Sequence, residues 1–158
     1  AMRHEEFRDL SGQPPMRALA EALIVCLGDA GPVFMYTNYE EQVIRTLGRL
    51  FADLKRDLDR IIGRLFDLHP VVKDHYYHPD MLGSWSIKAV LPTINPAMDY
   101  KKLEGIKEGT AASSGFLEAI SPETDMVRKL ELEEQLRRYC RFDTEAMVEI
   151  VRFFTARP

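Results

Sequence analysis

The sequence has few cysteines, no long apolar run and no excess of positive charge. Cys26 and Cys140 are its two cysteines in 158 residues, and they lack the paired spacing of a zinc knuckle or a disulfide framework. This favours a reducing, cytoplasmic setting. No apolar stretch reaches the roughly 18 residues of a membrane span, and no signal peptide is visible. We therefore expect no membrane partner.

The charge balance excludes a strongly basic protein. The net charge is −4 and the pI is about 5.6, so no global basic field attracts nucleic acid. A nuclease whose acidic site binds metal ions is still compatible with this balance. The length and the 46% hydrophobic content fit a single domain with one core over residues 1–158.

The sequence also has few strands. A short apolar run after a Gly-Pro break predicts a strand over 31–37, and residues 57–68 read either as a short helix or as a helix followed by a strand. Apolar periodicity predicts helices over 14–27, 40–54, 109–120, from 122 to about 140, and after Asp143. Residues 69–100 are rich in Pro, Gly and aromatics and read as a long irregular segment, with a helical turn or two over 86–91. The fold class is therefore α/β and helix-rich, and either helices dominate or part of a sheet is missing, because two strands alone are marginal.

Tyr139 and Asp143 stand four residues apart near the C-terminus, in "YCRFD". Structural roles are open to both: Asp143 as the N-cap of a last helix, and Tyr139 as a core residue of the preceding helix. A chemical role is also open. If the helix is continuous, both side chains leave one face, where the carboxylate could bind a divalent metal and the phenol could orient or help to deprotonate a water.

Tyr39 and Glu40 follow the predicted strand and open a helix. Glu40 suits the first turn of that helix, where an acid complements the helix dipole. It could equally be a metal-binding carboxylate at the C-terminal end of a strand, where α/β sites collect.

The stretch "DHYYHPD" places His75 and His78 three residues apart. A zinc site is one interpretation, and imidazoles that bond backbone carbonyls in a turn are the other. Farther along, Ser86 reads as a helix cap. Lys88 is a solvated lysine or, beside a metal site, a phosphate contact, with Tyr76 or Tyr77 stacking on a base.

Residues 75–92, "HYYHPDMLGSWSIKAVLP", closely resemble the signature of a bacterial domain family of unknown function. The resemblance extends over "VFMYTNYEEQVI", the Asp67-Leu68 pair, "DYKKLEGIKEGTAAS" and "RYCRFDTEAMV", which is most of the chain. Members of that family look like distant relatives of the DEDD 3′–5′ exonucleases in the ribonuclease H-like superfold. The resemblance implies metal-dependent cleavage of single-stranded DNA or RNA.

The resemblance also implies roles for individual residues. Tyr139 and Asp143 match the Tyr-x-x-x-Asp motif of the tyrosine (DEDDy) variant, and Tyr39-Glu40 matches the middle motif imperfectly, with Glu in place of Asp. The implied metal ligands for Mg²⁺ or Mn²⁺ are Glu40 and Asp143, and Tyr139 would position water. The implied substrate contacts are Tyr39, Tyr76, Tyr77, Ser86 and Lys88.

One part of the exonuclease pattern is absent. No Asp-x-Glu on an apolar strand precedes residue 31. The resemblance therefore implies a partial ribonuclease H-like fold, whose first strands lie upstream of this chain, and a domain inactive by itself. The strand over 32–37 would then expose an edge, for which we expect a homodimer. A non-catalytic nucleic-acid-binding or protein-interaction module with a degenerate nuclease site is the alternative.

Overall fold

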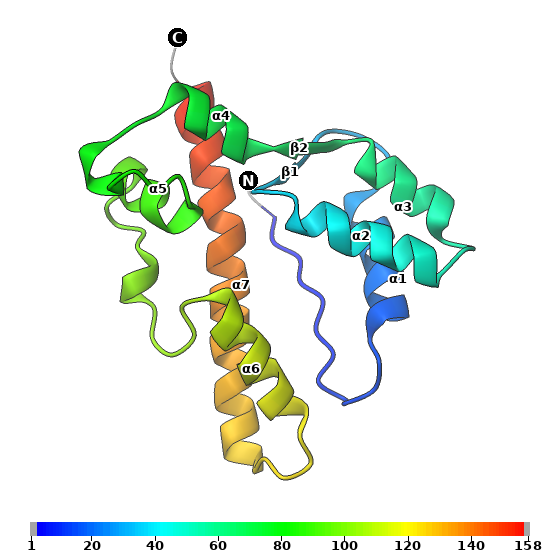
Figure 1. Ribbon diagram of the computed structural model, residues 1–158. Helices are drawn as coiled ribbons and strands as arrows, with labels where there is room; N and C mark the ends of the chain where they lie inside the picture. The colour runs from blue at the N-terminus through cyan, green and yellow to red at the C-terminus, as the bar shows by residue number, and fades with distance from the viewer. Residues whose placement is uncertain (1–2, 157–158) are drawn as a thin grey trace. The chain divides into compact units, whose positions relative to one another are not determined.

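The computed structural model of the protein describes residues 3–156, which form two compact units. The first unit comprises residues 3–9 and Gln13–Tyr76, and the second comprises Leu10–Gly12 and residues 77–156. Most of the described chain is helical, and its strands form one small parallel sheet. The protein is thus a helix-rich α/β protein (Figure 1).

The first unit alternates helices and short strands. Its elements are α1 (Met16–Leu27), β1 (Val33–Met35), α2 (Tyr39–Leu50), α3 (Lys55–Ile62), β2 (Leu65–Asp67) and α4 (Leu68–His75). The strands are parallel, with Val33 opposite Leu65 and Met35 opposite Asp67. Parallel strands need a crossover connection, and α2 and α3 provide it.

The core of the first unit lies between α1, α2 and α3. Its buried residues are Ala20, Ile44, Leu47, Leu58 and Ile61. Arg17 of α1 joins this core to the turn after α2, because it pairs with Asp53 at 2.6 Å and lies over the ring of Phe51 at 5.5 Å. Leu50, predicted on the apolar stripe of a longer helix, is 56% exposed, since α2 ends there instead of at residue 54.

Arg64 fixes the entry to both strands. Its backbone carbonyl accepts a hydrogen bond from the Val33 N–H at 2.9 Å. Its guanidinium donates to the carbonyls of Gly28 at 2.7 Å and Leu27 at 3.2 Å, at the end of α1. It also donates to the Ala30 carbonyl at 2.6 Å. Carbonyls at a helix C-terminus have no partner within the helix, so one side chain satisfies these groups and holds the turn that leads into β1.

The second unit is built on one long helix. Its elements are the 3-10 helix η1 (Pro79–Met81), α5 (Ile87–Ile94), the 3-10 helix η2 (Tyr100–Lys102), α6 (Gly109–Ile120) and α7 (Met126–Thr155). Both α5 and α6 pack on α7. Leu91, Tyr100, Leu103 and Ala146 form a buried cluster where α5, η2 and α7 meet.

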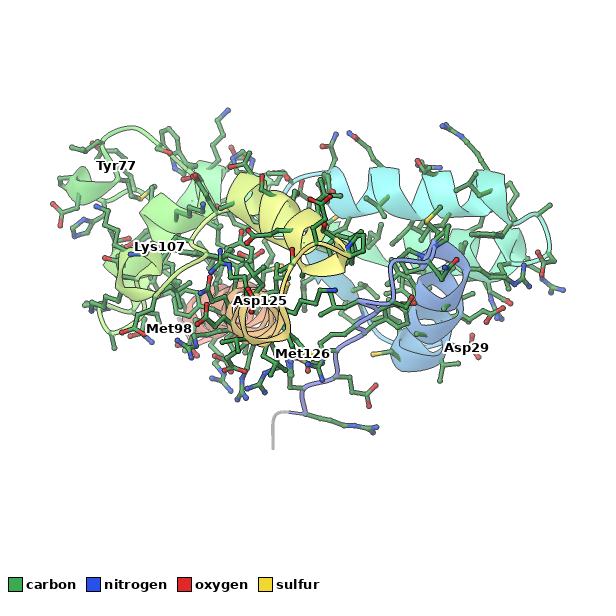
Figure 2. The ribbon with its side chains drawn as sticks, turned by 90° about the horizontal axis from the view of Figure 1, so that it is seen from below. Asp29, Tyr77, Met98, Lys107, Asp125 and Met126 are labelled. Carbon is green, nitrogen blue, oxygen red and sulfur yellow. The ribbon has the colours of Figure 1, made fainter. Side chains whose placement is uncertain are left out.

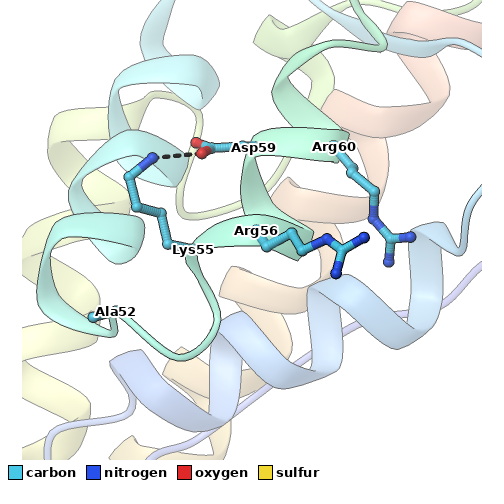
Figure 3. A pocket seen from close by; sticks show the side chains of 5 residues that line it. All are labelled: Ala52, Lys55, Arg56, Asp59 and Arg60. Carbon is cyan, nitrogen blue, oxygen red and sulfur yellow. Dashed lines mark hydrogen bonds and ion pairs between the residues drawn. The ribbon is translucent and has the colours of Figure 1, made fainter.

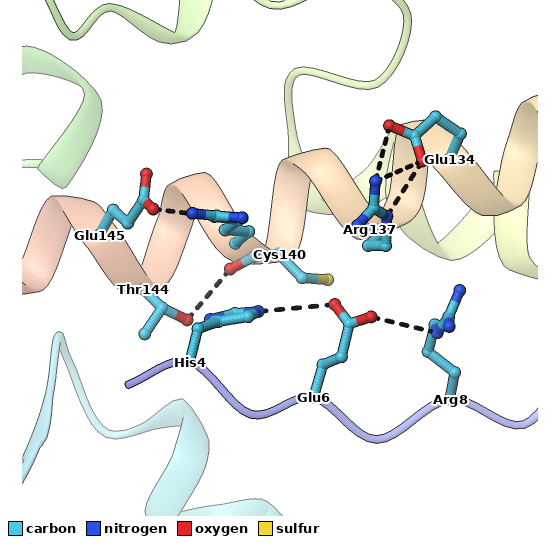
Figure 4. Close-up of polar contacts among 9 residues, drawn as sticks. His4, Glu6, Arg8, Glu134, Arg137, Cys140, Thr144 and Glu145 are labelled. Carbon is cyan, nitrogen blue, oxygen red and sulfur yellow. Dashed lines mark hydrogen bonds and ion pairs between the residues drawn. The ribbon is translucent and has the colours of Figure 1, made fainter. Parts of the chain in front are cut away.

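The helix α7 is continuous over 30 residues. It begins after Asp125, whose side chain accepts a hydrogen bond from the Arg128 N–H at 3.0 Å; Figure 2 labels Asp125 and Met126 at this end. Ion pairs within the helix support its exposed surface, such as Arg137 with Glu134 at 2.8 Å (Figure 4). The prediction of two helices, one opening at residues 121–122 and one after Asp143, was wrong.

The interpretation of residues 69–100 as mostly irregular was also wrong. Helix α4 was not predicted because the segment is rich in Pro, Gly and aromatics, yet Pro70 lies in the first turn, where no intrahelical donor is needed. Helix α5 continues past Pro92 to Ile94. Other expectations are confirmed: residues 57–68 hold the end of a helix and then a strand, and α6 covers the predicted 109–120.

No helix among residues 3–156 is long and apolar enough to cross a membrane. The single domain expected over 1–158 stays a prediction.

We predict that replacing Arg64 with Met lowers the free energy of unfolding by about 1.5 kcal/mol, because backbone carbonyls at the end of α1 and in the following turn lose a charged donor. The measurement is chemical denaturation followed by circular dichroism. Arg56→Met is the matched control: Arg56 is exposed, and its loss should change stability by less than about 0.5 kcal/mol. Equal effects of the two variants would contradict the assigned role of Arg64.

Candidate functional site

Tyr139 and Asp143 lie one turn apart on the continuous helix α7. Residues at this spacing share one face of a helix, so the condition for the chemical interpretation is met. The alternative role of Asp143 as an N-cap is wrong, because the backbone is helical on both sides of it.

Asp143 accepts a short hydrogen bond from the phenol of Tyr100. Tyr100 is only 3% exposed, and its ring lies edge-on to Phe142 at 4.8 Å and tilted to Tyr139 at 6.4 Å. Asp99 caps η2 by accepting from the Lys101 N–H at 2.9 Å. The short helix η2 thus carries a fixed phenol to the predicted carboxylate.

Lys88 lies close to the same ring. It stands in the first turn of α5, and its ammonium is 5.6 Å from the centre of the Tyr100 ring. Ser86 caps α5, because its hydroxyl accepts from the Ala89 N–H at 3.3 Å. We call Lys88, Tyr100, Tyr139 and Asp143 the α7 site. Three of these residues, Lys88, Tyr139 and Asp143, were predicted as site residues. The structure brings them together around Tyr100, which was not predicted.

Tyr139 is a neutral phenol at physiological pH. Partial burial, followed by the negative charge of Asp143, raises the pKa of Tyr139 to about 12. A phenol with such a pKa donates a hydrogen bond but does not take up a proton. Of the two roles considered for Tyr139, orienting a water fits this environment and deprotonating it does not.

The aromatic residues before α5 are unevenly exposed. Tyr77 is 62% exposed. The centres of the Tyr77 and Trp85 rings are 6.3 Å apart, and the ring planes are inclined by 47°. Tyr76 is half-buried and closes the first unit. Gly83 sits in a turn with φ of 79°. Tyr77 is thus available for a stacking contact.

In the first unit, the C-terminal ends of the strands carry a second polar group. One carboxylate oxygen of Asp67 accepts from the N–H groups of Thr37 and His69, each at 2.9 Å. Tyr36 lies edge-on to His69 at 5.5 Å, and burial together with the Asp67 charge raises the pKa of Tyr36. Thr37 has φ of 71°, an uncommon conformation that the Asp67 bond supports.

Tyr39 and Glu40 begin α2 close to these strand ends along the chain. Tyr39 is 70% exposed, and Glu40 is a half-buried acid of the first helical turn, where its charge complements the helix dipole. Glu40 belongs to the first unit and Asp143 to the second. Their convergence on one ion stays a prediction.

Within the described part of either unit, no cluster of acids and imidazoles could hold a divalent metal by itself. No three His, Cys, Asp or Glu side chains within residues 3–156 gather closely enough to hold one, whereas Mg²⁺ and related ions prefer about six oxygen ligands. The α7 site contributes a single carboxylate, Asp143. His75 and His78 of "DHYYHPD" likewise belong to no such cluster among the described residues.

A shallow depression on α3 is lined by basic residues, most of whose charges are already neutralised by neighbouring acids. It is lined by Ala52, Lys55, Arg56, Asp59 and Arg60 (Figure 3). Lys55 pairs with Asp59, and Arg60 pairs with Asp57 at 2.7 Å. These pairs satisfy most of its charge, which makes it a solvated helix surface.

Two residues of these sites were missed by the sequence analysis. Asp67 had a local signal, since an Asp before a helical segment is a favoured N-cap, but the helix itself was not recognised. Tyr100 had none, because its hydrogen-bond partner lies 43 residues later in the chain.

The raised pKa of Tyr139 predicts a dependence of stability on pH. The folded protein holds this proton to about pH 12, whereas an unfolded tyrosine loses it near pH 10. The stabilisation is therefore complete below pH 10 and is lost between pH 10 and 12. Absorbance titration of wild type against Tyr139→Phe measures the phenol directly. A difference curve centred at the unfolded value would contradict the burial of Tyr139.

A known family matches part of the chain. The profile of a domain of unknown function, DUF2779, matches residues 1–86, which is more than half of the chain. The match includes Tyr39, Glu40, Tyr76, Tyr77 and Ser86 and ends before Lys88. No curated protein and no solved structure matches the chain. The chain belongs to the DUF2779 family.

Proposed function

We propose that this chain is an exonuclease-like domain that binds single-stranded DNA or RNA. The arrangement of the α7 site supports the proposal: a carboxylate and a phenol share one helix face, and a lysine lies beside them. In this proposal Lys88 contacts a phosphate, exposed Tyr77 stacks on a base, and the cap Ser86 shapes the adjoining surface. Tyr39 and Tyr76 belong to the first unit and are proposed as substrate contacts there.

The proposal includes a relation to the ribonuclease H-like superfold. Two parallel strands joined by a helical crossover support it, together with the sequence resemblance. Cleavage in the 3′–5′ direction would need Mg²⁺ or Mn²⁺, with Glu40 and Asp143 as ligands. Because neither unit by itself gathers enough ligands for such an ion, we propose that this chain binds a strand without cleaving it.

The second candidate is a non-catalytic nucleic-acid-binding or protein-interaction module. It is favoured by one observation: a carboxylate oxygen of Asp143 is already engaged by Tyr100, as in a structural hydrogen bond. Strand binding distinguishes the proposal from a protein-interaction module, and cleavage in the presence of metal distinguishes it from an active nuclease.

We predict that a fluorescein-labelled single strand binds at low salt and is not cleaved in Mg²⁺ or Mn²⁺. Lys88→Gln should weaken binding about fivefold, the upper range for one exposed charge contact. Lys129→Gln is the control, because Lys129 lies about 20 Å from Asp143 along α7. Anisotropy and gel electrophoresis report binding and cleavage.

No binding of the strand by wild type would contradict nucleic-acid binding and leave a protein-interaction module. Cleavage that is abolished by Asp143→Asn would contradict the inactivity of the chain and support a catalytic domain.

The partner prediction extends to a homodimer through β1. Strand β1 pairs with β2 in the two-stranded sheet, and Val33 directs its N–H toward β2. Backbone groups alternate along a strand, so the Phe34 N–H points to the opposite edge. Such an edge pairs readily with another chain. We propose a two-fold dimer formed across it.

We predict that Phe34→Pro converts the dimer to a monomer, because proline removes the outward N–H. Phe34→Ala keeps that N–H and should remain dimeric. Sedimentation equilibrium at micromolar concentration gives the mass of each protein. A monomeric wild type would contradict the dimer.

A further inference from the structure

Tyr100 is the residue on which the α7 site is arranged. Its ring is buried, its position is set by the Asp99 cap, and its phenol donates to Asp143. These contacts come from η2 and α7, which are distant in sequence. The Asp143 carboxylate is consequently held in one orientation by a rigid donor.

Lys88 has a different environment from its neighbouring lysines. Lys102 donates to the Pro96 carbonyl at 2.8 Å and Lys107 to the Lys101 carbonyl at 3.0 Å. Within the described chain, Lys88 forms no hydrogen bond or ion pair; its ammonium lies at the Tyr100 ring. A cation held against an aromatic ring keeps its charge available for an anion.

The arginines near Asp143 on α7 already have acidic partners. Arg141 pairs with Glu145 at 2.9 Å, and Arg138 pairs with Glu134 at 3.5 Å. The Lys88 ammonium thus lies at the Tyr100 ring, and the Asp143 carboxylate is bonded to the hydroxyl of the same side chain. A lysine side chain is long and flexible enough to seek such a carboxylate. Among the described residues the two form no ion pair, and Asp143 accepts from a neutral donor instead.

We propose that Tyr100 is a positioning residue that holds Asp143 away from Lys88 and so leaves the Lys88 ammonium free to bind a phosphate oxygen of a single strand. This inference rests on the proposed function for its ligand. The hydroxyl of Tyr100 fixes the carboxylate, and the ring of Tyr100 supports the ammonium. Without the hydroxyl, Asp143 turns to Lys88 and neutralises it.

The test is a double-mutant cycle on strand affinity. Tyr100→Phe keeps the ring and removes the hydroxyl. It is expected to weaken binding of a labelled single strand about fivefold, as Lys88→Gln does. The slope of log affinity against log salt should become smaller by about 0.7, the contribution of one phosphate contact on a single strand.

The Asp143→Asn background separates positioning from a structural role. If Tyr100 acts by restraining the carboxylate, Tyr100→Phe has no further effect once that charge is removed. Tyr100→Phe also leaves strand affinity unchanged in the Lys88→Gln background. An equal loss of affinity with and without the Asp143 charge would overturn the proposal, as would unchanged binding by Tyr100→Phe. Circular dichroism confirms that each variant is folded.

A second measurement decides the matter if wild type binds no strand, in which case the proposed function fails by itself. Competitive acetylation with acetic anhydride, read by mass spectrometry, reports the accessibility of the Lys88 amine. Its reactivity should fall in Tyr100→Phe and recover in Tyr100→Phe/Asp143→Asn. Unchanged reactivity in Tyr100→Phe would overturn the positioning role independently of any nucleic acid.

Discussion

The hydrogen bonds of Arg64 are the constraint on which the first unit depends. Two parallel strands of three residues each make too few backbone hydrogen bonds to be stable alone. Arg64 ties the end of α1 and the following turn to the start of β2, while its own carbonyl pairs with β1. At the opposite ends of the strands, Asp67 binds the N–H groups of Thr37 and His69. One cation and one anion thus define both ends of the sheet.

In the second unit, the long helix α7 determines how the residues of the α7 site are arranged. In α7 the separation of Tyr139 and Asp143 is set by helical geometry, and their environment is set by what packs on that face. Tyr100 arrives from η2 and Lys88 from α5. The arrangement raises the pKa of Tyr139 and keeps its phenol neutral, so the polarity of the α7 site comes from one carboxylate and one ammonium.

Sequence periodicity was sufficient for the regular elements and insufficient for their junctions. Helix α6 and the helix-to-strand order of α3 and β2 follow from apolar spacing and turn residues. The composition of residues 69–100, rich in Pro, Gly and aromatics, hid helix α4, although the first-turn position of Pro70 is compatible with a helix. Asp143 looked like a cap because an Asp before an apolar segment commonly is one, and nothing local distinguishes that from a mid-helix acid.

Part of the candidate site could be predicted from the sequence, and part of it could not. Tyr139, Asp143 and Lys88 were chosen by residue type and spacing, and the structure places them around one ring. The residue that provides this ring, Tyr100, could not be chosen, because a hydrogen bond across 43 positions depends on tertiary packing.

The continuity of α7 has a consequence for how the α7 site can vary. Helix geometry fixes the rise between Tyr139 and Asp143 at about 6 Å, and this rise cannot be lengthened without breaking backbone hydrogen bonds. The segment that bears Tyr100 has no such restriction. It is an irregular stretch between α5 and α6, braced by Lys102 and Lys107 against its own carbonyls. Any difference in the shape of the site must therefore come from this segment, because the spacing on α7 is fixed.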